Sequence, residues 1–467
     1  MEVNPMQGID YTAGSIHRLL FRTAVPMLLA SLVNVITQMA NVFFLGHTSQ
    51  SVLYVLSLYI PVSFVMIAII EAMQLSVQVA VARSRAGGSR AFTQLFVHMM
   101  GSAMLLAILT GGIVMLMTPV LSWFYRVPAD IGPMFTLYVG GMMAVSIPAV
   151  LAAVTSAALR GLGRAQAASW NAVGMAMLNI ALVYTFVSVF GLDLKGIIYA
   201  NLITSVLSLA ISLLILFIRR EMIFERFAFA KKHLMALRHV GIPVFISYCM
   251  IFLSTFFFNK IVSHFGEGAV AGFGVGYRIQ TMAILPGIVI GSAIGIIINH
   301  NLQSPHRPRA YASYRQGLLQ SFVLYVIIAV AVWIWRDPLI AFLIEDAATR
   351  AEAAQYLSIV ALSYIGMGPM MTTLLTMEQS GRGYQAILLN AVYFLIIIVL
   401  GWGLTRAFNE VTYFYAVIAG MNVVGMSSFF LPFMRMLKRE YVESSADKDI
   451  STEGEATLPN KSYSTQT

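Results

Sequence analysis

The chain has 467 residues, of which 59% are hydrophobic and 10% charged, with a net charge of +9 and a mean hydropathy of +0.80. A soluble domain cannot bury this much apolar surface, so the composition predicts a polytopic membrane protein without a soluble domain. The single cysteine, Cys249, excludes an intramolecular disulfide framework and a thiolate metal cluster. The first twenty residues lack the pattern of a cleavable signal peptide, so we expect none to be removed.

Twelve apolar segments can be drawn along the chain, and most reach the ~20 residues that a helix needs to cross a bilayer. The runs are continuous and lack the alternation of membrane strands, which favours an all-α fold. In chain order they are residues 17–46, 51–82, 91–118, 133–159, 166–190, 194–218, 239–264, 268–300, 311–335, 350–377, 385–407 and 411–435.

The basic residues indicate how these helices are oriented. If both termini lie on one side, one set of alternate connections holds 20 Lys and Arg and the other set holds 6. This bias places both termini in the cytoplasm, and we expect a multi-pass protein of the inner (plasma) membrane. The positive charge is thus explained by topology. We expect the lipid bilayer and a small organic substrate as partners, no nucleic acid, and a monomer.

An internal repeat divides the chain into two halves. Residues 166–173 read QAASWNAV and residues 385–392 read QAILLNAV, with five of eight positions identical at an offset of 219. Just upstream, Gly161-Leu-Gly163 corresponds to Gly381-Arg-Gly383. Because six helices per half is an even number, the repeat is parallel, and such pairs of lobes typically form transporters with a cleft between them.

These observations give a domain organisation with two six-helix lobes. Residues 17–218 form the N-lobe and residues 239–435 form the C-lobe. Residues 219–238 form a cytoplasmic amphipathic linker that lies at the membrane interface. Residues 1–16 are a cytoplasmic N-terminal segment, and residues 436–467 are a cytoplasmic tail with little to bury, which we expect to be disordered.

Glu71 is expected to be the one acidic side chain deep inside an apolar span. It is 12 residues from Arg83, or about 18 Å along a helix, and therefore close to the middle of the membrane. A carboxylate at this depth is costly and marks an ion, proton or substrate path by default, so we favour a functional role. Gln74 and Gln78 follow Glu71 on the same helix face.

The first span carries a similar polar stripe of Asn34, Gln38 and Asn41. If the first two spans pack as neighbours, the two stripes provide carboxylate and amide oxygens for Na⁺, a hard cation. Alternatively, Glu71 takes up a proton, and protonation switches its hydrogen bonding. For the amides alone we favour a structural role, with each interhelical hydrogen bond worth about 1 kcal/mol. No cofactor is expected beyond H⁺ or Na⁺ as the coupling ion.

Three further polar residues lie in or near apolar spans. Glu378 is four residues from Arg382 and is expected to pair with it near the headgroups. Arg278 either attracts an anionic substrate group, holds a carboxylate, or is bonded to the backbone or snorkels to the interface. His98 either relays protons or, as we favour, is a satisfied structural histidine.

Several short motifs are similar to those of the multidrug and toxic compound extrusion (MATE) family. They are Pro26 with Gly46-His47, Leu159-Arg-Gly-Leu-Gly163, Leu178-Asn179-Ile180, Gly241-Ile-Pro243, Gly276-Tyr-Arg278 and Gly381-Arg-Gly-Tyr384. The resemblance covers about residues 15–440. It implies a secondary exporter that works by alternating access and moves bulky, often cationic organic molecules outward against the entry of Na⁺ or H⁺.

The chain departs from the family pattern where the family commonly has acids. Asn41 stands at the acidic position of the first span, and Val183 stands four residues after Asn179 in place of Asp. In the second half, the positions that are acidic in one branch align with Ile251 and Met371. The predicted coupling site therefore uses other residues, namely Glu71, Asn34, Gln38, Asn41, Gln74 and Asn179.

The substrate cleft is predicted from residues that combine polarity, charge and flexible apolar surface. Its predicted members are Gln78, Asn171, Tyr277, Arg278, Met282 and Asn390. Methionine and phenylalanine side chains can provide an adaptable apolar wall, for example Met250, Phe252, Phe256, Phe257 and Met282.

Two other transport functions remain open from the sequence. One is a lipid-linked oligosaccharide flippase of a related two-lobe fold, although its polyanionic substrate should require several Arg or Lys in the cavity. The other is a dedicated exporter of one natural product or siderophore. The sequence contains no zinc-protease pair, no nucleophile elbow and no phosphate-binding loop, so we do not expect an enzyme or an ATP-driven pump.

Overall fold

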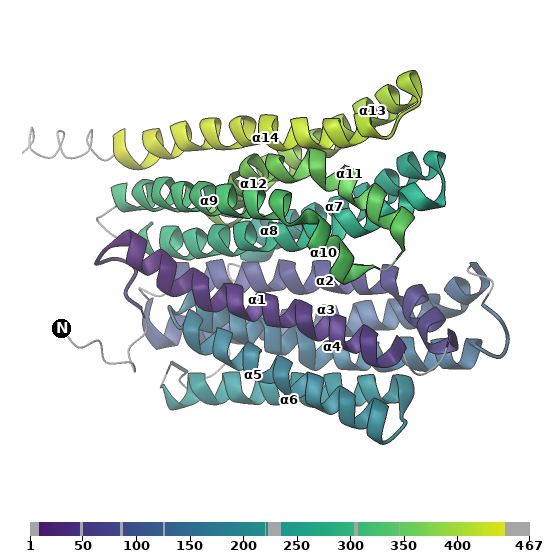
Figure 1. Ribbon diagram of the computed structural model, residues 1–467. Coiled ribbons are helices and arrows are strands. Elements are labelled where there is room, and N and C mark those ends of the chain that lie inside the picture. Colours follow the sequence, from purple (N-terminus) through teal and green to yellow (C-terminus); the bar gives the residue numbers. More distant parts are fainter. Residues whose placement is uncertain are drawn as a thin grey trace, which may run out of the picture.

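The computed structural model describes residues 9–46, 50–84, 87–124, 127–219, 221–222, 235–302, 307–344 and 346–443. Within these ranges every regular element is a helix. Figure 1 shows the long helices running roughly along one common direction. Helices satisfy their backbone hydrogen bonds internally, which is what an apolar chain requires in lipid. The predicted all-α fold is confirmed.

The first lobe consists of six long helices that agree with the first six predicted spans to within a few residues. A π-helical segment, η2 (Tyr184–Val189), extends α5. The six helices are α1 (Ile16–Gly46), α2 (Gln50–Ser84), α3 (Gly88–Phe124), α4 (Gly132–Gly161), α5 (Ala165–Val183) and α6 (Asp193–Ile218).

The second lobe has the same number of crossings but more breaks in its helices. Its first four crossings and connections are η4 (Leu237–Gly241), α7 (Ile242–Val262), η5 (Ser263–Phe265), α8 (Glu267–Asn301), α9 (Pro308–Ile334), α10 (Arg336–Leu343), α11 (Ala347–Val360), η6 (Ala361–Ser363) and α12 (Tyr364–Met377). The last two are η7 (Glu378–Arg382), α13 (Gly383–Phe408), α14 (Thr412–Lys438) and η8 (Arg439–Glu443). The short helix α10 was not predicted.

By length and hydropathy, eleven segments of the described chain qualify as membrane spans. One of them, Ala347–Phe408, has 62 residues, about three times the ~20 residues of one minimal crossing. It contains two predicted spans, and Gly381 divides it with a left-handed φ of 84°. Counting these two separately accounts for the twelve predicted helices.

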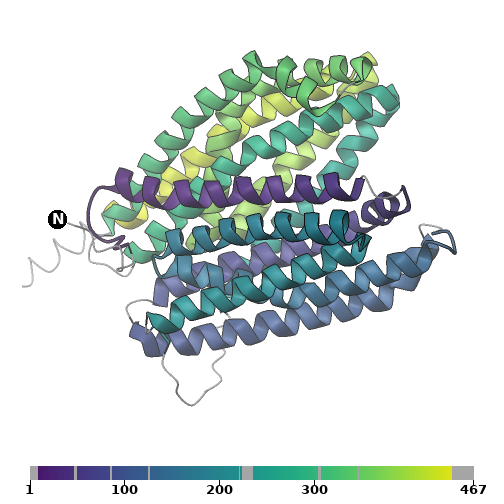
Figure 2. The ribbon, with the colours of Figure 1, turned by 60° about the horizontal axis from the view of Figure 1, so that its bottom comes forward.

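Both lobes use the same helix packing. In the N-lobe, α4 packs on α2, α3 and α6, and α5 packs on α1. In the C-lobe, α12 packs on α8, α9 and α14, and α13 packs on α7. Across the lobes, α1 packs on α8 and α2 packs on α7. The two lobes lie close together at the end that holds the N-terminus and diverge toward the other end (Figure 2).

The repeat has a different register in the turns before α5 and α13 than the sequence match predicts. Gly163 and Gly381 are the equivalent turn residues, with φ of 82° and 84°, a conformation that favours glycine. The predicted match of Gly161 with Gly381 is therefore shifted by two residues. The following residues form equivalent ion pairs, Arg164–Glu221 at 2.7 Å and Arg382–Glu440 at 2.5 Å.

Several predicted boundary segments lie partly outside the described residues. Residues 1–8, most of the linker and residues 444–467 lie outside, so the linker and the disordered tail stay predictions. The last helix continues through η8 to Glu443, beyond the predicted end at residue 435. The described N-terminal segment packs on the C-lobe: Tyr11 is fully buried, and Asn301 donates a hydrogen bond to its carbonyl oxygen at 3.0 Å.

Candidate functional site

A cavity of about 600 Å³ lies between the two lobes. Its walls come from α1, α2, α4, α5 and α6 of the N-lobe and from α7, α8 and α12 of the C-lobe. About half of the lining side chains are polar, and the N-lobe contributes nearly all of these. The volume lies in the usual range of small-molecule sites, and the position between lobes is typical of transporter sites.

The cavity brings together all six residues of the predicted coupling site. The lining includes Glu71, Asn34, Gln38, Asn41, Gln74 and Asn179. The expected close packing of the first two spans is not found, because α1 packs chiefly on α5 and α8 and touches α2 only lightly. The two polar stripes therefore come together as parts of the lining of one cavity. Their role in coupling stays a prediction.

Glu71 is the acidic residue of the cavity wall. Its side chain is half-buried and opens into the cavity. Among the residues that the structure describes, none forms a hydrogen bond or an ion pair with its carboxylate, although Arg160 is close enough to interact electrostatically. A carboxylate accepts hydrogen bonds at two oxygens, so Glu71 keeps its full capacity to bind a cation or a proton.

Arg160 is a cavity residue that the sequence analysis missed, because it was grouped with the arginines of the connections. It lies in the last turn of α4, and helical side chains point back toward the N-terminus, so its guanidinium reaches inward. Arg160 donates to Gln78 Oε1 at 2.8 Å, to Gln74 Oε1 at 2.6 Å and to Ser156 Oγ at 3.3 Å. Ser156, one turn earlier on the same face, was the available signal.

A chain of amides connects α1, α5 and α6 at one wall of the cavity. Asn41 donates to Asn179 Oδ1 at 3.5 Å, and Asn179 donates to Asn201 Oδ1 and Thr204 Oγ1, each at 3.2 Å. The Oδ1 atom of Asn41 is buried and has no donor among the described residues. A buried oxygen in this situation indicates a place for a water molecule or a cation. Asn201 was not predicted.

A second polar network joins the lobes beside the cavity. Gln78 is 1% exposed and donates to Ser292 Oγ and to Gln379 Oε1, both at 3.0 Å. Arg83 donates to Asn299 Oδ1 at 2.7 Å. These residues lie in the last turns of α2 and α8 and at the start of η7. The hydrogen bonds therefore hold the lobes together at the end of the bundle where they approach each other (Figure 2).

The predicted substrate residues are not gathered in this cavity. Asn171 instead donates to the Ser212 hydroxyl of α6 at 2.9 Å, and Tyr277 stacks on Phe273 within the C-lobe. Arg278 is exposed, and Asn390 is 2% exposed. Among the lining residues that the structure describes, none belongs to the predicted set of Gln78, Asn171, Tyr277, Arg278, Met282 and Asn390. Their role in substrate binding stays a prediction.

The prediction for Glu378 is wrong. Its side chain is 1% exposed, and the Ser247 hydroxyl donates to its Oε1 at 2.7 Å. Arg382 instead pairs with Glu440. The four-residue spacing assumes an α-helix, but η7 is a π-helix interrupted by the left-handed Gly381, so the two side chains do not share a face. Glu71 is therefore not the one buried acid in the described chain.

His98 fits the structural reading that we favoured. It is 4% exposed, and its Nδ1 lies 2.6 Å from the carbonyl oxygen of Gln94, one turn earlier in α3.

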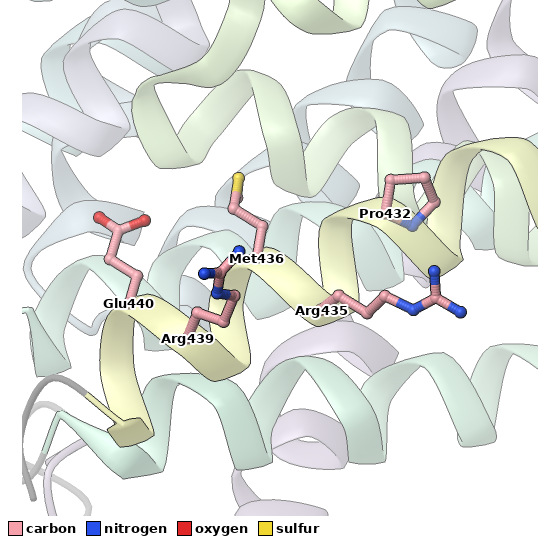
Figure 3. A pocket seen from close by; sticks show the side chains of 5 residues that line it. All are labelled: Pro432, Arg435, Met436, Arg439 and Glu440. Carbon is pink, nitrogen blue, oxygen red and sulfur yellow. The ribbon is translucent and has the colours of Figure 1, made fainter.

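A hollow on the surface of the C-lobe is a weaker candidate for the functional site. It lies along α14 and η8 and is lined by Pro432, Arg435, Met436, Arg439 and Glu440 (Figure 3). Both arginines and Glu440 are exposed to solvent, and Glu440 already pairs with Arg382. None of the sequence-predicted site residues lines it, so the cavity between the lobes is the stronger candidate.

Comparisons with known proteins agree with this architecture. The MatE family model matches residues 243–402, which cover most of the C-lobe. The chain is 23% identical over 341 residues to the probable multidrug resistance protein NorM of Thermotoga maritima, which covers 71% of this chain and 73% of that protein. It is 22% identical over 233 residues to the probable multidrug resistance protein YoeA of Bacillus subtilis, which covers 48% of this chain. The match spans about half, 50%, of the length of that relative.

A solved structure extends the likeness to both lobes. The crystal structure of a mutant of the Vibrio cholerae MATE transporter VcmN superposes with a TM-score of 0.86. The alignment has 19% sequence identity and covers 91% of this chain and 98% of that chain. The resemblance inferred from the sequence motifs is thus confirmed: this chain has the fold of the MATE transporters and carries the MatE sequence pattern in its second lobe.

Proposed function

We propose that the protein is a secondary active exporter that moves bulky organic solutes across the membrane in exchange for H⁺ or Na⁺. The solute enters the cavity between the lobes, and the lobes alternate between two states that open toward opposite sides. The proposal is supported by the MATE fold, by the similarity to multidrug resistance proteins, and by a cavity that both lobes line.

The observation that carries this proposal is the carboxylate of Glu71 in the cavity wall, which has no hydrogen-bond or ion-pair partner within the described chain. An ionised carboxylate within a membrane span is costly and requires a counter-ion, and the closest cationic group, Arg160, makes no ion pair with it among the described residues. A proton, Na⁺ or a cationic group of the solute can fill this role. Since they compete for one carboxylate, entry of the ion releases the solute, which is the requirement for antiport.

The surrounding amides have a role in either version of the coupling. Asn34, Gln38 and Asn41 provide neutral oxygens that, with Glu71, suit Na⁺ as a hard cation. With H⁺ as the coupling ion, the same amides are hydrogen-bond partners for the protonated carboxyl group. In both versions the ion binds the two states of the transporter unequally, because binding can shift an equilibrium only by its difference in affinity.

The interlobe network stabilises the state seen here relative to the state that opens at the end holding the N-terminus. For the cavity to open at the end that holds the N-terminus, the bonds from Gln78 to Ser292 and Gln379 and from Arg83 to Asn299 must break. Each such bond contributes about 1 kcal/mol. Ligands in the cavity therefore need to supply a differential binding energy of a few kcal/mol to change the state.

The proposal includes a location and an orientation. We place the protein in the inner (plasma) membrane with both termini in the cytoplasm, because of the 20-to-6 distribution of basic residues between alternate connections. A monomer is sufficient, since the two lobes of one chain enclose the cavity. A flippase for polyanionic lipids is disfavoured because Arg160 is the single Arg or Lys among the described lining residues.

The test is solute efflux from proteoliposomes under separately imposed pH and Na⁺ gradients, with wild type and Glu71→Gln in parallel. We use tetraphenylphosphonium as a lipophilic cation together with polar solutes. We expect one gradient to drive efflux in the wild type and the variant to lose at least ~100-fold in this rate, because it cannot bind the ion. Equal gradient-driven efflux in the variant contradicts the assignment of Glu71, and an absence of any gradient-driven flux contradicts the exporter.

A further inference from the structure

The cavity contains one charge of each sign. Among the described lining residues, Glu71 and Arg160 are the two charged side chains. They interact electrostatically, yet no hydrogen bond or ion pair joins them. Arg160 uses three of its N–H groups on Gln78, Gln74 and Ser156, and a guanidinium has five. Counting only described residues, the cavity therefore has a carboxylate without a partner and a guanidinium with two N–H groups left for a ligand.

The rest of the polar wall also has open hydrogen-bonding capacity. Asn34 and Gln38 are exposed in the cavity, and within the described part of the chain their amides have no hydrogen-bond partner. A purely apolar ligand would remove these amides from water without replacing their hydrogen bonds. That lowers affinity by roughly tenfold or more for each group. Polar ligands with several amide or hydroxyl groups avoid this loss.

The C-lobe wall is mostly aliphatic. Leu285, Ile288, Val289 and Leu375 make up most of its lining, together with Ser292. Tyr248 is the one aromatic side chain among the described lining residues. Sites that select delocalised organic cations typically surround them with aromatic faces, and this cavity has a single ring. An amphipathic ligand with small aliphatic groups fits the two walls better.

We propose that the cavity binds a peptide-like zwitterion. Its ammonium group pairs with Glu71, its carboxylate pairs with the free donors of Arg160, and its amides bond to Asn34 and Gln38. Small aliphatic side chains lie against the C-lobe wall. This substrate class rests on the proposed export function, and it fits a cavity that combines amides, one charge of each sign and aliphatic side chains.

The first test uses the wild-type protein in lipid nanodiscs and calorimetric titration with tetraalanine. The series comprises the free peptide, its N-acetylated form, its C-terminal amide and the doubly blocked peptide, with tetraphenylphosphonium as the lipophilic cation. We expect each blocked end to weaken binding about tenfold or more, since each removes a charge-assisted hydrogen bond. We also expect tetraphenylphosphonium to bind more weakly than the free peptide. Equal binding of free and doubly blocked peptides overturns the proposal, and so does an absence of binding by the peptides.

The second test assigns each charge of the ligand to a residue. Glu71→Gln should abolish the preference for a free amino terminus and keep the preference for a free carboxylate. Arg160→Gln should do the reverse, and Arg160→Lys should keep both preferences if the charge is what matters. The matched controls Glu410→Gln and Arg406→Gln, exposed at the α13–α14 connection, should retain both. If Arg160→Gln does not fold, the role of the positive charge is tested with Arg160→Lys and with the wild-type peptide series, in which a blocked carboxylate should still weaken binding.

Failure of this inference is distinguishable from failure of the exporter. If proteoliposomes show gradient-driven efflux of tetraphenylphosphonium that depends on Glu71 while the peptides show no charge preference, the proposed function stands and the zwitterion is excluded. If the peptides bind with the expected preference but no gradient moves any solute, the site is correctly described and the protein is not an antiporter.

Discussion

The two lobes pack their helices in the same way but differ in the side chains that lie between the helices. The N-lobe places polar side chains on α2 that reach the cavity or the interlobe network, namely Glu71, Gln74 and Gln78. The bounds of α2 and α8 differ by 217, so the equivalent α8 residues are Ile288, Gly291 and Gly295. Of these, Ile288 lines the cavity with an aliphatic side chain. The same helix face is thus polar in the N-lobe and apolar in the C-lobe.

The side chains of the two lobes also differ in size. The C-lobe core contains large aromatic residues, and the Tyr356 and Tyr415 rings meet edge to face with centroids 5.0 Å apart. In the N-lobe, α4 and α5 present small residues to the cavity, such as Ala149, Ala153 and Ala172. Large aromatic side chains fill the space between helices, whereas alanines leave it open. The C-lobe interior is therefore filled by side chains, and the N-lobe contains most of the polar groups that line the cavity.

Placing a carboxylate on the buried face of α8 should have the largest effect, and removing Glu71 from α2 a much smaller one. Ile290→Glu puts a carboxylate without a partner into the apolar core, and we expect it to lower the free energy of unfolding by about 3 kcal/mol. Glu71→Ile should change stability by less than about 1 kcal/mol, since apolar replacement of a buried charge is often neutral. Thermal unfolding in detergent measures both. Equal destabilisation by the two substitutions would mean that the interiors of the two lobes tolerate a carboxylate equally well, which would contradict the comparison.

The interlobe contact can be weakened without changing either lobe's charge. Gln379→Ala removes the acceptor for Gln78, and we expect the state that is open at the N-terminal end to gain about tenfold in population. Distances between spin labels placed on the two lobes report this population. Gln355→Ala is the control, because Gln355 bonds to Thr412 within the C-lobe at the surface. An unchanged distance distribution in Gln379→Ala would show that the network does not hold the state.

The equivalent turns should respond equally to substitution. Gly163→Ala and Gly381→Ala each force a side chain into the left-handed region, which costs about 1 kcal/mol. At Gly381 an added Cβ meets the Arg83 guanidinium at 3.5 Å, an ordinary contact. Unfolding midpoints of the two variants should fall by similar amounts. A much larger loss in one lobe would show that the repeat is not energetically equivalent at this turn.

The smallest effect on stability is expected from the two equivalent ion pairs, one in each lobe. Glu221 is 25% exposed in its pair with Arg164, and Glu440 is 45% exposed in its pair with Arg382. Both pairs are worth less than about 1 kcal/mol, because partly exposed ion pairs are screened. Glu221→Gln should cost more than Glu440→Gln, and added salt should reduce the difference. The reverse order in thermal unfolding would contradict this ranking.

The sequence by itself determined the membrane class, the helices and the repeat, because lipid leaves an apolar chain little choice but to form helices of bilayer length. It also singled out Glu71, since the cost of an ionised group in hydrocarbon is visible from composition alone. Both features depend on local chemistry, so neither requires knowledge of which helices are neighbours.

Only the tertiary structure decided how these elements combine into a site. From the sequence, Arg160 is interpreted as a residue of a connection, because the direction of its side chain is not known. Glu378 is interpreted as the partner of Arg382, whereas in the structure the left-handed Gly381 separates the two side chains. The packing of α1 on α8 across the lobes brings the polar stripes to one cavity. The physical reason is that these contacts join residues far apart in the chain, and sequence periodicity describes only the face of one helix at a time.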